Sequence, residues 1–376
     1  MAAGDAALER DTDRERPDIA VLISYSGDGG VERMINHLVQ GFLDAGRRVD
    51  ILALKQRGGH FLALPEGVRV VPIRPAHSAL AVPAIARYLR RVRPRTLLAA
   101  KDRAGRAAVQ AHRLSGSDAR VVVRIGNNLS ASLVHRTRLQ RWLRLRPIRR
   151  LYPLAEAIVA VSAGVAEDVV ATSGIDPKRV HVIANPVVTP EVDRLAAAPP
   201  EHPWVDGDQP LLVAVGRLTR QKDFSTLLHA FAKLRTKRDA RLLILGEGED
   251  RAALDALVTR LGLGESVDMP GFYANPYPLM AAADLFVLSS RWEGSPNALT
   301  EALYLGVPSV ATDCPSGSSD ILPRERLAPV GDTDALAAIM ASTLDQPREG
   351  GDLRAAVADY TLARSAAGYM AVLDGA

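Results

Sequence analysis

The stretch DLFVLSSRWEGSPNALTEALYLGVPSVAT (284–312) joins two short apolar runs through a loop and an amphipathic segment. The runs DLFVLS (284–289) and VPSVAT (307–312) are typical of buried parallel strands. Between them, Ser295 is predicted to cap a helix and Pro296 to occupy its first turn. The stretch therefore predicts one β-α-β unit of a parallel sheet.

The same alternation extends outward over most of the chain. Further strands are expected at 18–24, 49–54, 68–73, 95–100, 120–125, 157–161, 179–184, 211–216, 241–246 and 266–271. Repeated β-α units indicate an α/β fold with two doubly wound, Rossmann-like domains facing across a cleft. In such sheets, ligands bind at the carboxyl ends of the strands.

One interruption divides the pattern, because residues 189–210 contain five prolines and little apolar periodicity. We expect a disordered lead-in at 1–17, an N-terminal domain at 18–188, a linker at 189–210 and a C-terminal domain at 211–350. Helices in 351–376 are expected to pack back toward the N-terminal domain.

Composition narrows the class of protein. Hydrophobic residues make up 47% of the 376 residues and charged residues 24%, which is typical of a soluble globular protein. Cys314 is the single cysteine, so no internal disulfide can form and a reducing compartment is expected. No apolar run approaches the roughly 18 residues that a membrane-spanning helix needs.

The charge is divided unevenly between the two halves. Residues 1–200 contain 31 Lys and Arg against 19 Asp and Glu, whereas residues 201–376 contain 16 against 24. A basic first half predicts contact with something anionic, such as a phospholipid surface, a pyrophosphate-linked acceptor or a nucleic acid.

The helix predicted after Ser295 suits a diphosphate. Backbone N–H groups near Asn297, Ala298 and Leu299 would point out of its first turn, where the helix dipole favours an anion. Glu301 lies about one turn deeper, where a carboxylate could accept both ribose hydroxyls, and Glu293 precedes the helix on the sugar side. An ordinary capped helix with a solvated glutamate is the alternative interpretation.

A second segment, AVGRLTRQKDF (214–224), follows another strand. Gly216 ends that strand, and Arg217 and Lys222 come next. Two fixed cations at a strand end can neutralise a diphosphate leaving group without a metal. Two solvated loop cations are the alternative here, and the glutamate segment downstream favours the diphosphate.

These motifs together resemble the family 4 retaining glycosyltransferases of the GT-B fold, and the proline-serine-glycine ending resembles members that build bacterial surface polysaccharides. The resemblance covers nearly the whole chain. It rests on GGVERMINHLVQGFLDAGRRVDILAL (29–54), AIVAVSAGVAEDV (157–169), VIANPV (182–187), GRLTRQKDF (216–224), LGEGED (245–250), GF (271–272), EGSPNALTEAL (293–303) and TDCPSGSSDIL (312–322).

The resemblance implies a role for each matching residue. Arg217 and Lys222 would bind the donor diphosphate, Glu301 the ribose, and Glu293 would face the transferred sugar; these cations and Glu293 are the catalytic candidates. The remaining donor-binding candidates are Gly216, Glu247 by the base, Gly294, Ser295, Pro296, Asn297, Ala298 and Leu299. Gly29 and Gly30 would line the acceptor side, which the resemblance assigns to the N-terminal domain (18–188), and the donor would bind the C-terminal domain (211–350).

The chain also departs from the family pattern. Many members carry a histidine beside the sugar, whereas VVVRIGNNLS (121–130) has none, so Arg124, Asn127 or Asn128 is expected to serve on the acceptor side. The three Asp-x-Asp pairs, at 11/13, 206/208 and 332/334, are interpreted as capping or solvated residues. We therefore expect no metal and no cofactor, since the nucleotide sugar is a substrate.

The stretch SLVHRTRLQRWLRLRPIRRLYP (132–153) carries seven arginines interleaved with apolar residues. Leu139, Trp142, Leu143 and Ile148 approximate one helical face. That face could lie on an anionic membrane, or it could pack against its own domain with the arginines solvated. Without further stacking aromatics or a nucleic-acid-binding motif, no nucleic-acid partner is expected.

The sequence thus predicts a metal-independent hexosyltransferase that moves a sugar, with UDP favoured as the nucleotide, to a hydroxyl of a glycan or lipid-linked glycan in bacterial polysaccharide synthesis. A nucleotide-sugar epimerase of the same fold, a GDP-mannose-dependent mannosyltransferase, a non-enzymatic nucleotide-sugar binder and a nucleic-acid-binding protein remain alternatives. The expected location is cytoplasmic, with residues 132–153 adding the hypothesis of a peripheral position on the inner face of the cell membrane.

Overall fold

The computed structural model describes residues 16–26, 29–346 and 353–375. The chain divides into two compact units. The first comprises the described parts of Met1–Val161, Val165–Pro186 and Leu362–Ala376, and the second comprises Ser162–Gly164 and the described parts of Val187–Thr361. The expected lead-in lies outside the described residues up to residue 15, whereas Arg16 already donates a hydrogen bond to the Pro94 carbonyl, at 3.2 Å.

The first unit is built on a seven-stranded parallel sheet with the order β3-β2-β1-β4-β5-β6-β7. Its strands are β1 (Ile19–Ser26), β2 (Val49–Arg57), β3 (Arg69–Pro72), β4 (Thr96–Ala99), β5 (Arg120–Ile125), β6 (Ala157–Ala160) and β7 (Val180–Val182). All seven coincide with predicted apolar runs, because a strand covered on both faces is apolar almost throughout.

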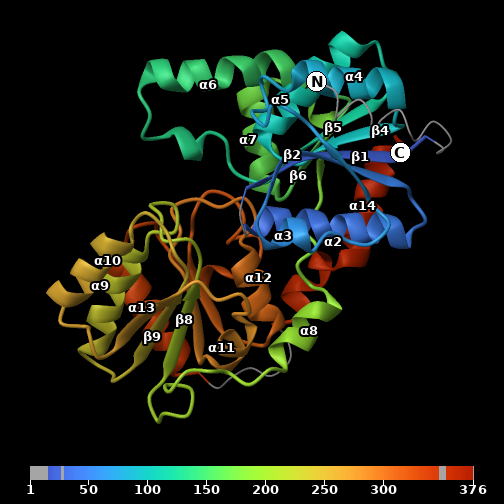
Figure 1. Ribbon diagram of the computed structural model, residues 1–376. Helices are drawn as coiled ribbons and strands as arrows, with labels where there is room; N and C mark the ends of the chain where they lie inside the picture. The colour runs from blue at the N-terminus through green and yellow to red at the C-terminus, as the bar shows by residue number, and fades with distance from the viewer. Residues whose placement is uncertain (1–15, 27–28, 347–352, 376) are drawn as a thin grey trace. The chain divides into compact units, whose positions relative to one another are not determined.

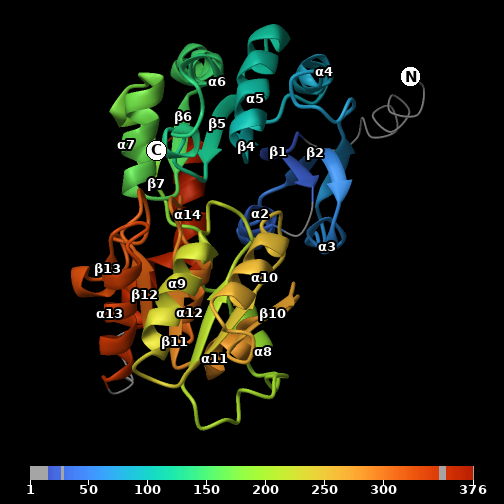
Figure 2. The same ribbon diagram turned by 90° about the vertical axis from the view of Figure 1, so that its left-hand side faces the viewer.

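Helices cover both faces of this sheet (Figures 1 and 2). They are α2 (Gly30–Asp44), α3 (Gly59–Leu62), α4 (Val82–Val92), α5 (Asp102–Ser115), α6 (Arg138–Leu151), α7 (Ala163–Ser173) and α14 (Leu362–Asp374), with short 3₁₀ turns at Ala131–Leu133, Tyr152–Leu154 and Pro177–Arg179. Side chains of α2 and α14 form one buried cluster with the sheet, and those of α4, α5 and α7 form another on the opposite face.

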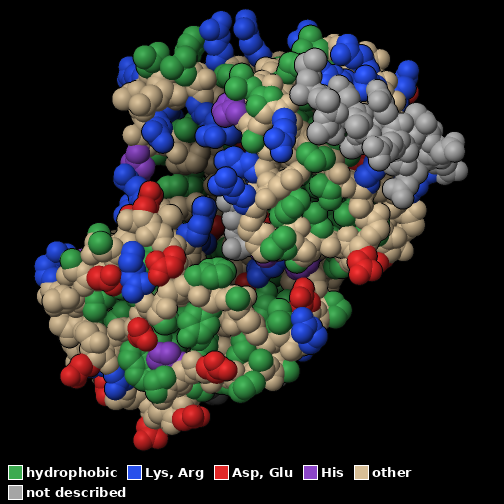
Figure 3. Space-filling view, viewed as in Figure 1, with side chains coloured by type: hydrophobic (Ala, Val, Ile, Leu, Met, Phe, Trp, Pro, Cys, Tyr) green, Lys and Arg blue, Asp and Glu red, His purple; other side chains and the backbone are tan. Residues whose placement is uncertain are grey.

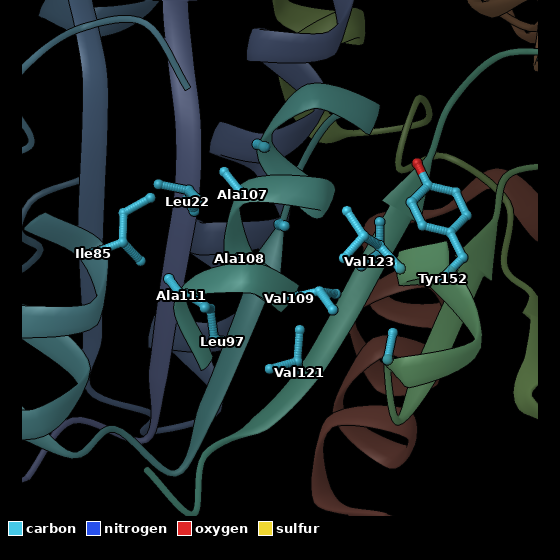
Figure 4. Packing of buried hydrophobic residues seen from close by; sticks show 14 of the residues in the cluster. Leu22, Ile85, Leu97, Ala107, Ala108, Val109, Ala111, Val121, Val123 and Tyr152 are labelled. Atoms are coloured by element: carbon cyan, nitrogen blue, oxygen red, sulfur yellow. The ribbon is translucent and has the colours of Figure 1, made fainter. Parts of the chain in front are cut away.

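Helix α5 lies close to the sheet because small residues form its inner face. Ala107, Ala108 and Ala111 of α5 belong to the same buried cluster as Val121 and Val123 of β5, and Figure 4 labels all five. Gly105 lies on the same helix, and a Cβ atom there would be only 2.4 Å from Val123 Cγ1. The close packing of α5 therefore depends on a missing methyl group as well as on the alanines.

The second unit repeats the architecture around a six-stranded parallel sheet with the order β10-β9-β8-β11-β12-β13. Its strands are β8 (Leu211–Val215), β9 (Arg241–Leu245), β10 (Val267–Gly271), β11 (Leu285–Leu288), β12 (Ser309–Thr312) and β13 (Leu327–Ala328). Its helices are α8 (Pro190–Ala196), α9 (Phe224–Arg235), α10 (Arg251–Arg260), α11 (Tyr277–Ala282), α12 (Asn297–Tyr304) and α13 (Thr333–Leu344), with 3₁₀ turns at Arg324–Arg326 and Ala355–Tyr360. The prediction of two doubly wound parallel sheets is confirmed.

Two expected boundaries differ from the limits of the compact units. Residues 189–210 are not a linker between the units but part of the second unit, because α8 buries Val192 and Tyr304 donates a 2.7 Å hydrogen bond to Asp193 there. The last residues also divide: 355–361 stay with the second unit, and only residues from Leu362 onward belong to the first. The unit boundary at Pro186 and Val187 lies where the hydrophobic alternation pauses.

We predict that Gly105→Ala destabilises the protein. The added methyl group would overpack the α5–β5 contact, at about 1–3 kcal/mol, against a helix-propensity gain of about 1 kcal/mol. Chemical denaturation followed by circular dichroism measures the change. Gly264→Ala is the control, since nothing lies within 4 Å of a Cβ at that position.

The double variant Gly105→Ala/Val123→Ala separates overpacking from other causes. If the new methyl group meets Val123 Cγ1, the losses of stability caused by the two changes should be less than additive. Fully additive losses of stability would contradict this account of the α5–β5 contact.

Candidate functional site

The site in the second unit is placed by a switch in strand order. Strands β8 and β11 are neighbours at the centre of the sheet, but the chain leaves them toward opposite edges, to β9 and to β12. The loops that follow such a pair diverge and leave a crevice at the carboxyl ends of the strands. Arg217 and Lys222 follow β8 directly, and Glu293 follows β11.

A buried ion pair joins these two loops. Lys222 Nζ lies 2.7 Å from Glu293 Oε1, and Ser290 Oγ donates to the same carboxylate oxygen at 2.6 Å. Glu293 is only 6% exposed. The loops are also tied by Ser289 Oγ, which donates to the Lys222 carbonyl at 2.8 Å. The structure thus brings together two of the predicted residues that lie 71 positions apart.

Glycines allow the strand ends to converge around this pair. The Lys222 side chain passes over Gly216, where a Cβ would be 3.0 Å from Lys222 Cε. Gly246, at the end of β9, has φ +152°, and a Cβ there would lie 1.9 Å from the Gly216 carbonyl oxygen. A larger residue at Gly246 would therefore push β9 away from the loop that carries the cations.

Cys314 lies in the same buried environment. Burial raises the pKa of its thiol to about 12, and the negative charge of Glu293 adds to the rise, whereas Ser318 and Lys222 oppose it. The thiol therefore stays protonated at neutral pH, and Cys314 acts as a small buried side chain beneath the ion pair rather than as a nucleophile.

Helix α12 begins one residue later than predicted. Pro296 is its N-cap, without a side-chain hydrogen bond, and Ser295 Oγ is buried without a partner among the described residues, so Ser295 does not cap the helix. The N–H of Asn297 bonds to the Ser295 carbonyl and that of Leu299 to the Pro296 carbonyl. These two groups are therefore used in the turn, and neither points freely outward as expected.

Glu301 lies on the first turn and a half of α12 and is 3% exposed. Tyr277 Oη, from the start of α11, donates to Glu301 Oε1 at 3.3 Å. Sequence reasoning missed both Tyr277 and Ser290. Ser290 follows a strand and could have been noticed, but no pattern in the chain pairs Tyr277 with Glu301.

The remaining donor-side candidates are more open. Arg217 is exposed and forms no salt bridge with the described residues, so its charge is available to an anion. Glu247, predicted to lie by the base, is exposed and pairs with Arg251 at 2.9 Å. Its Oε1 also lies close to Gly271, 3.1 Å from where a Cβ would be.

The predicted residues of the first unit differ in position and in burial. Gly29 is the N-cap of α2 and Gly30 its first residue. Arg124 is 1% exposed, and its Nη2 donates to Asn185 Oδ1 at 2.7 Å. Burial raises the pKa of the neighbouring Tyr369, and the Arg124 guanidinium opposes that rise. Arg124 thus faces the interior, because its side chain lies under α14.

The two asparagines also differ. Asn128 is 6% exposed and its Oδ1 accepts from the Ala131 N–H at 2.9 Å, so it holds the turn after β5 together. Asn127 is half-buried, and its Oδ1 accepts from the Asn128 N–H. Of the three residues expected to replace a histidine, Asn127 is the most exposed, whereas Arg124 and Asn128 are buried.

The arginine-rich stretch forms α6, which begins with a capping box between Thr137 and Gln140. The apolar residues Leu139, Trp142 and Leu143 are 65%, 49% and 55% exposed, so they do not pack against their own unit. Ile148 was grouped with them, but it is 1% exposed and belongs to the inner face. In Figure 3, apolar and basic side chains lie side by side over the position of α6.

Not all of its arginines are free. Arg144 forms a 2.7 Å salt bridge with Asp102 of α5, which also accepts from Tyr152 Oη at 2.7 Å. Arg146 stacks over the Trp142 ring at 4.9 Å. Asp102 therefore anchors α6 to α5. Separately, none of the described helices is long and apolar enough to cross a bilayer.

The third Asp-x-Asp pair is a helix cap, as interpreted. Asp332 Oδ1 accepts from the N–H groups of Asp334 and Ala335 at the start of α13, at 3.0 and 2.9 Å.

Comparison with known families matches both halves of the chain. Residues 28–190 match the model described as Glycosyltransferase Family 4, and residues 209–346 match the model described as Glycosyl transferases group 1.

Curated relatives are enzymes of glycan synthesis by name. The chain is 34% identical over 174 residues to the N-acetylgalactosamine-N,N'-diacetylbacillosaminyl-diphospho-undecaprenol 4-alpha-N-acetylgalactosaminyltransferase of Campylobacter jejuni, a match that covers 46% of each chain. It is 29% identical over 302 residues to the lipopolysaccharide core biosynthesis glycosyltransferase LpsE of Rhizobium meliloti, which covers 77% of each. The chain thus spans less than half the length of the first relative and about three quarters of the second.

Solved structures share the fold. The lipopolysaccharide outer core galactosyltransferase WaaB superposes with a TM-score of 0.70 at 19% identity, covering 95% of this chain and 98% of WaaB. HepE of Anabaena, in complex with UDP and glucose, superposes with a TM-score of 0.76 at 19% identity, covering 96% and 100%.

Proposed function

The chain has a Glycosyltransferase Family 4 domain followed by a Glycosyl transferases group 1 domain, and on that basis we propose that it transfers a sugar from a nucleoside-diphosphate sugar to a hydroxyl group of an acceptor. The observation that carries the proposal is the Lys222–Glu293 ion pair at the switch point of the second sheet, with the exposed Arg217 beside it and Glu301 on the adjoining helix. A nucleoside-diphosphate sugar needs cations for its diphosphate, a carboxylate for its ribose and polar groups for its sugar, and these residues provide them in that arrangement.

The chemistry needs little from the protein beyond charge and position. The bond between the anomeric carbon and the leaving phosphate oxygen breaks, and its electron pair goes to the phosphate. The acceptor oxygen bonds to the anomeric carbon from the same face, so configuration is retained, and the leaving phosphate oxygen takes the acceptor's proton. Arg217 and Lys222 stabilise the charge that develops on the phosphate. No protein base is assigned.

The division of roles follows burial. Glu301, held by Tyr277, binds the ribose hydroxyls, and Glu293, held by Lys222 and Ser290, faces the transferred sugar. Lys222 is thus shared between the diphosphate and Glu293. Glu247 and the nearby Gly271 lie at the edge where the base binds.

We favour UDP as the nucleotide, since HepE, which has the same fold, binds UDP and glucose. The acceptor is a glycan or lipid-linked glycan, by analogy with the names of the Campylobacter and Rhizobium relatives. A mannosyltransferase would prefer GDP-mannose in the same assay. An epimerase would leave the mass of every acceptor unchanged, because it transfers no sugar.

The outer face of α6 supports a location for the enzyme on the cytoplasmic face of the membrane. Exposed Leu139, Trp142 and Leu143 provide apolar insertion, and the exposed arginines around them provide attraction to anionic lipid. Each basic residue near such a surface contributes about 1 kcal/mol. An enzyme held there would meet a lipid-linked acceptor on a shared surface.

We expect Arg217→Ala to weaken UDP binding about tenfold or more, because a charge-assisted contact is lost. Isothermal titration calorimetry measures the change. Arg220→Ala is the control, an exposed arginine of the same loop. Lys222→Ala is less suitable, since it would leave Glu293 buried without its cation. Equal UDP affinities for Arg217→Ala and wild type would place the diphosphate elsewhere.

Turnover should survive removal of divalent metal, because the two cations do the work that a metal would do. The measurement is UDP release from a panel of UDP-sugars after EDTA treatment and dialysis. Complete loss of turnover, restored by Mg²⁺ or Mn²⁺, would refute the metal-free mechanism.

Wild-type protein should co-sediment with phosphatidylglycerol vesicles at low salt, but not with phosphatidylcholine vesicles or at high salt. Leu139→Ser/Trp142→Ser and Arg138→Ser/Arg141→Ser should each reduce binding. Arg144 is left intact because it anchors α6 to Asp102. The matched control is Arg113→Ser/Leu114→Ser, an exposed arginine and an exposed leucine on α5.

If wild type stays in the supernatant with anionic vesicles at low salt, the α6 face is only solvated, and a soluble acceptor becomes the better hypothesis.

A further inference from the structure

The first sheet has its own switch point, and a second ion pair lies there. Strands β1 and β4 are central neighbours, and the chain leaves them toward opposite edges, to β2 and to β5. Glu32 lies on the first turn of α2, which follows β1, and Lys101 is the N-cap of α5, which follows β4. Lys101 Nζ is 2.6 Å from Glu32 Oε1 and 3.2 Å from the Ser24 carbonyl.

This pair matches the ion pair of the second unit in its place and its burial. The side chains of Glu32 and Lys101 are 5% and 31% exposed, against 8% and 19% for Glu293 and Lys222. In both sheets, one partner follows the first strand of the unit and the other follows the strand beyond the switch. The order differs, with the glutamate first in one unit and the lysine first in the other, and Glu32 lies on a helix whereas Lys222 and Glu293 lie in loops.

A third buried pair shows what a purely structural one looks like. Asp50, near the start of β2, accepts two hydrogen bonds from Arg69, at the start of β3, and a third from Tyr88. It lies at the amino edge of the sheet, opposite the switch point, and its donors come from two elements, β3 and α4. Its side chains are 5% and 24% exposed, so burial alone does not distinguish it from Glu32–Lys101.

The geometry of Glu32–Lys101 suits a sugar ring better than an anion. The pair as a whole is neutral, and the Glu32 carboxylate would repel a phosphate that approached Lys101. A carboxylate oxygen and an ammonium group 2.6 Å apart instead match two neighbouring hydroxyls, one donating to the carboxylate and the other accepting from the ammonium. Gly29 leaves space beside the carboxylate, since a Cβ there would be 2.8 Å from Glu32 Oε2.

We propose that Glu32 and Lys101 bind neighbouring hydroxyls of a neutral sugar ring in the acceptor, which makes the acceptor a glycan rather than a bare lipid phosphate. The proposal rests on the proposed function only in calling that sugar the acceptor. Binding of the sugar itself, and binding of UDP by the second unit, can be measured separately.

The test uses the full chain and saturation-transfer difference NMR. The probes are methyl α-D-glucopyranoside, methyl α-D-galactopyranoside and methyl 2-acetamido-2-deoxy-α-D-glucopyranoside, with inorganic pyrophosphate as the anionic probe. We expect at least one glycoside to bind wild type, and its affinity to fall about tenfold or more in Glu32→Gln and in Lys101→Met. Lys101→Arg, which keeps a cationic donor, should retain most of the signal.

Arg69→Met is the matched control, because it breaks a pair of equal burial at the other edge of the same sheet. It should lower stability without changing glycoside binding. UDP affinity, measured by calorimetry, should be unchanged in all four variants.

Three results would overturn the proposal: no glycoside binds wild type, Glu32→Gln and Lys101→Met bind as wild type does, or Arg69→Met weakens binding as much as they do. Pyrophosphate binding that disappears in Lys101→Met would overturn it too, by making the site anionic. Failure of wild type to bind UDP would instead refute the proposed function, while the glycoside titrations would still decide the sugar site.

Discussion

Parallel strands can be joined only by crossovers, so every loop that follows a strand opens at the same edge of its sheet. In both units, the one place at that edge where consecutive crossovers diverge lies between two central strands, β1 and β4 or β8 and β11. Elsewhere the helices of adjacent crossovers cover the strands. The structure places a buried lysine–glutamate pair at each of these two points. The order of the strands therefore determines where the candidate sites lie, and the individual residues determine what those sites can bind.

Such pairs are costly, because each charge loses its water and the Coulomb attraction only partly offsets the loss. The structure reduces the cost with additional hydrogen bonds. Glu293 accepts from Ser290 as well as from Lys222, and Lys101 donates to a backbone carbonyl as well as to Glu32. Apolar residues of similar volume would stabilise the fold at least as well, which favours a role in binding for charges kept at these positions.

Much of this could be predicted from the sequence, because the signals are local. Apolar runs located twelve of the thirteen strands of the described chain and failed only for β13, whose two residues are too few to form a pattern. The motif around Glu293 indicated its neighbours in the site. What the sequence could not indicate depended on packing between distant segments: α8 joins the second unit through Val192, and Glu32 meets Lys101 across 69 positions. Helix α12 starts one residue late because Pro296, not Ser295, is its N-cap.

Helix α14 packs in the first unit although the whole second unit precedes it in the chain. Its Tyr369, Val372 and Leu373 complete the cluster formed by α2 and the sheet, and Thr96 Oγ1 donates to the Leu373 carbonyl. During translation, the second unit therefore leaves the ribosome with all its strands while the first still exposes an uncovered apolar face. The ribosome adds the covering helix only after the 175 residues of Val187–Thr361, at roughly 5–20 residues per second. The first unit to be made is thus the last to be finished, because its apolar face stays uncovered until α14 has been added.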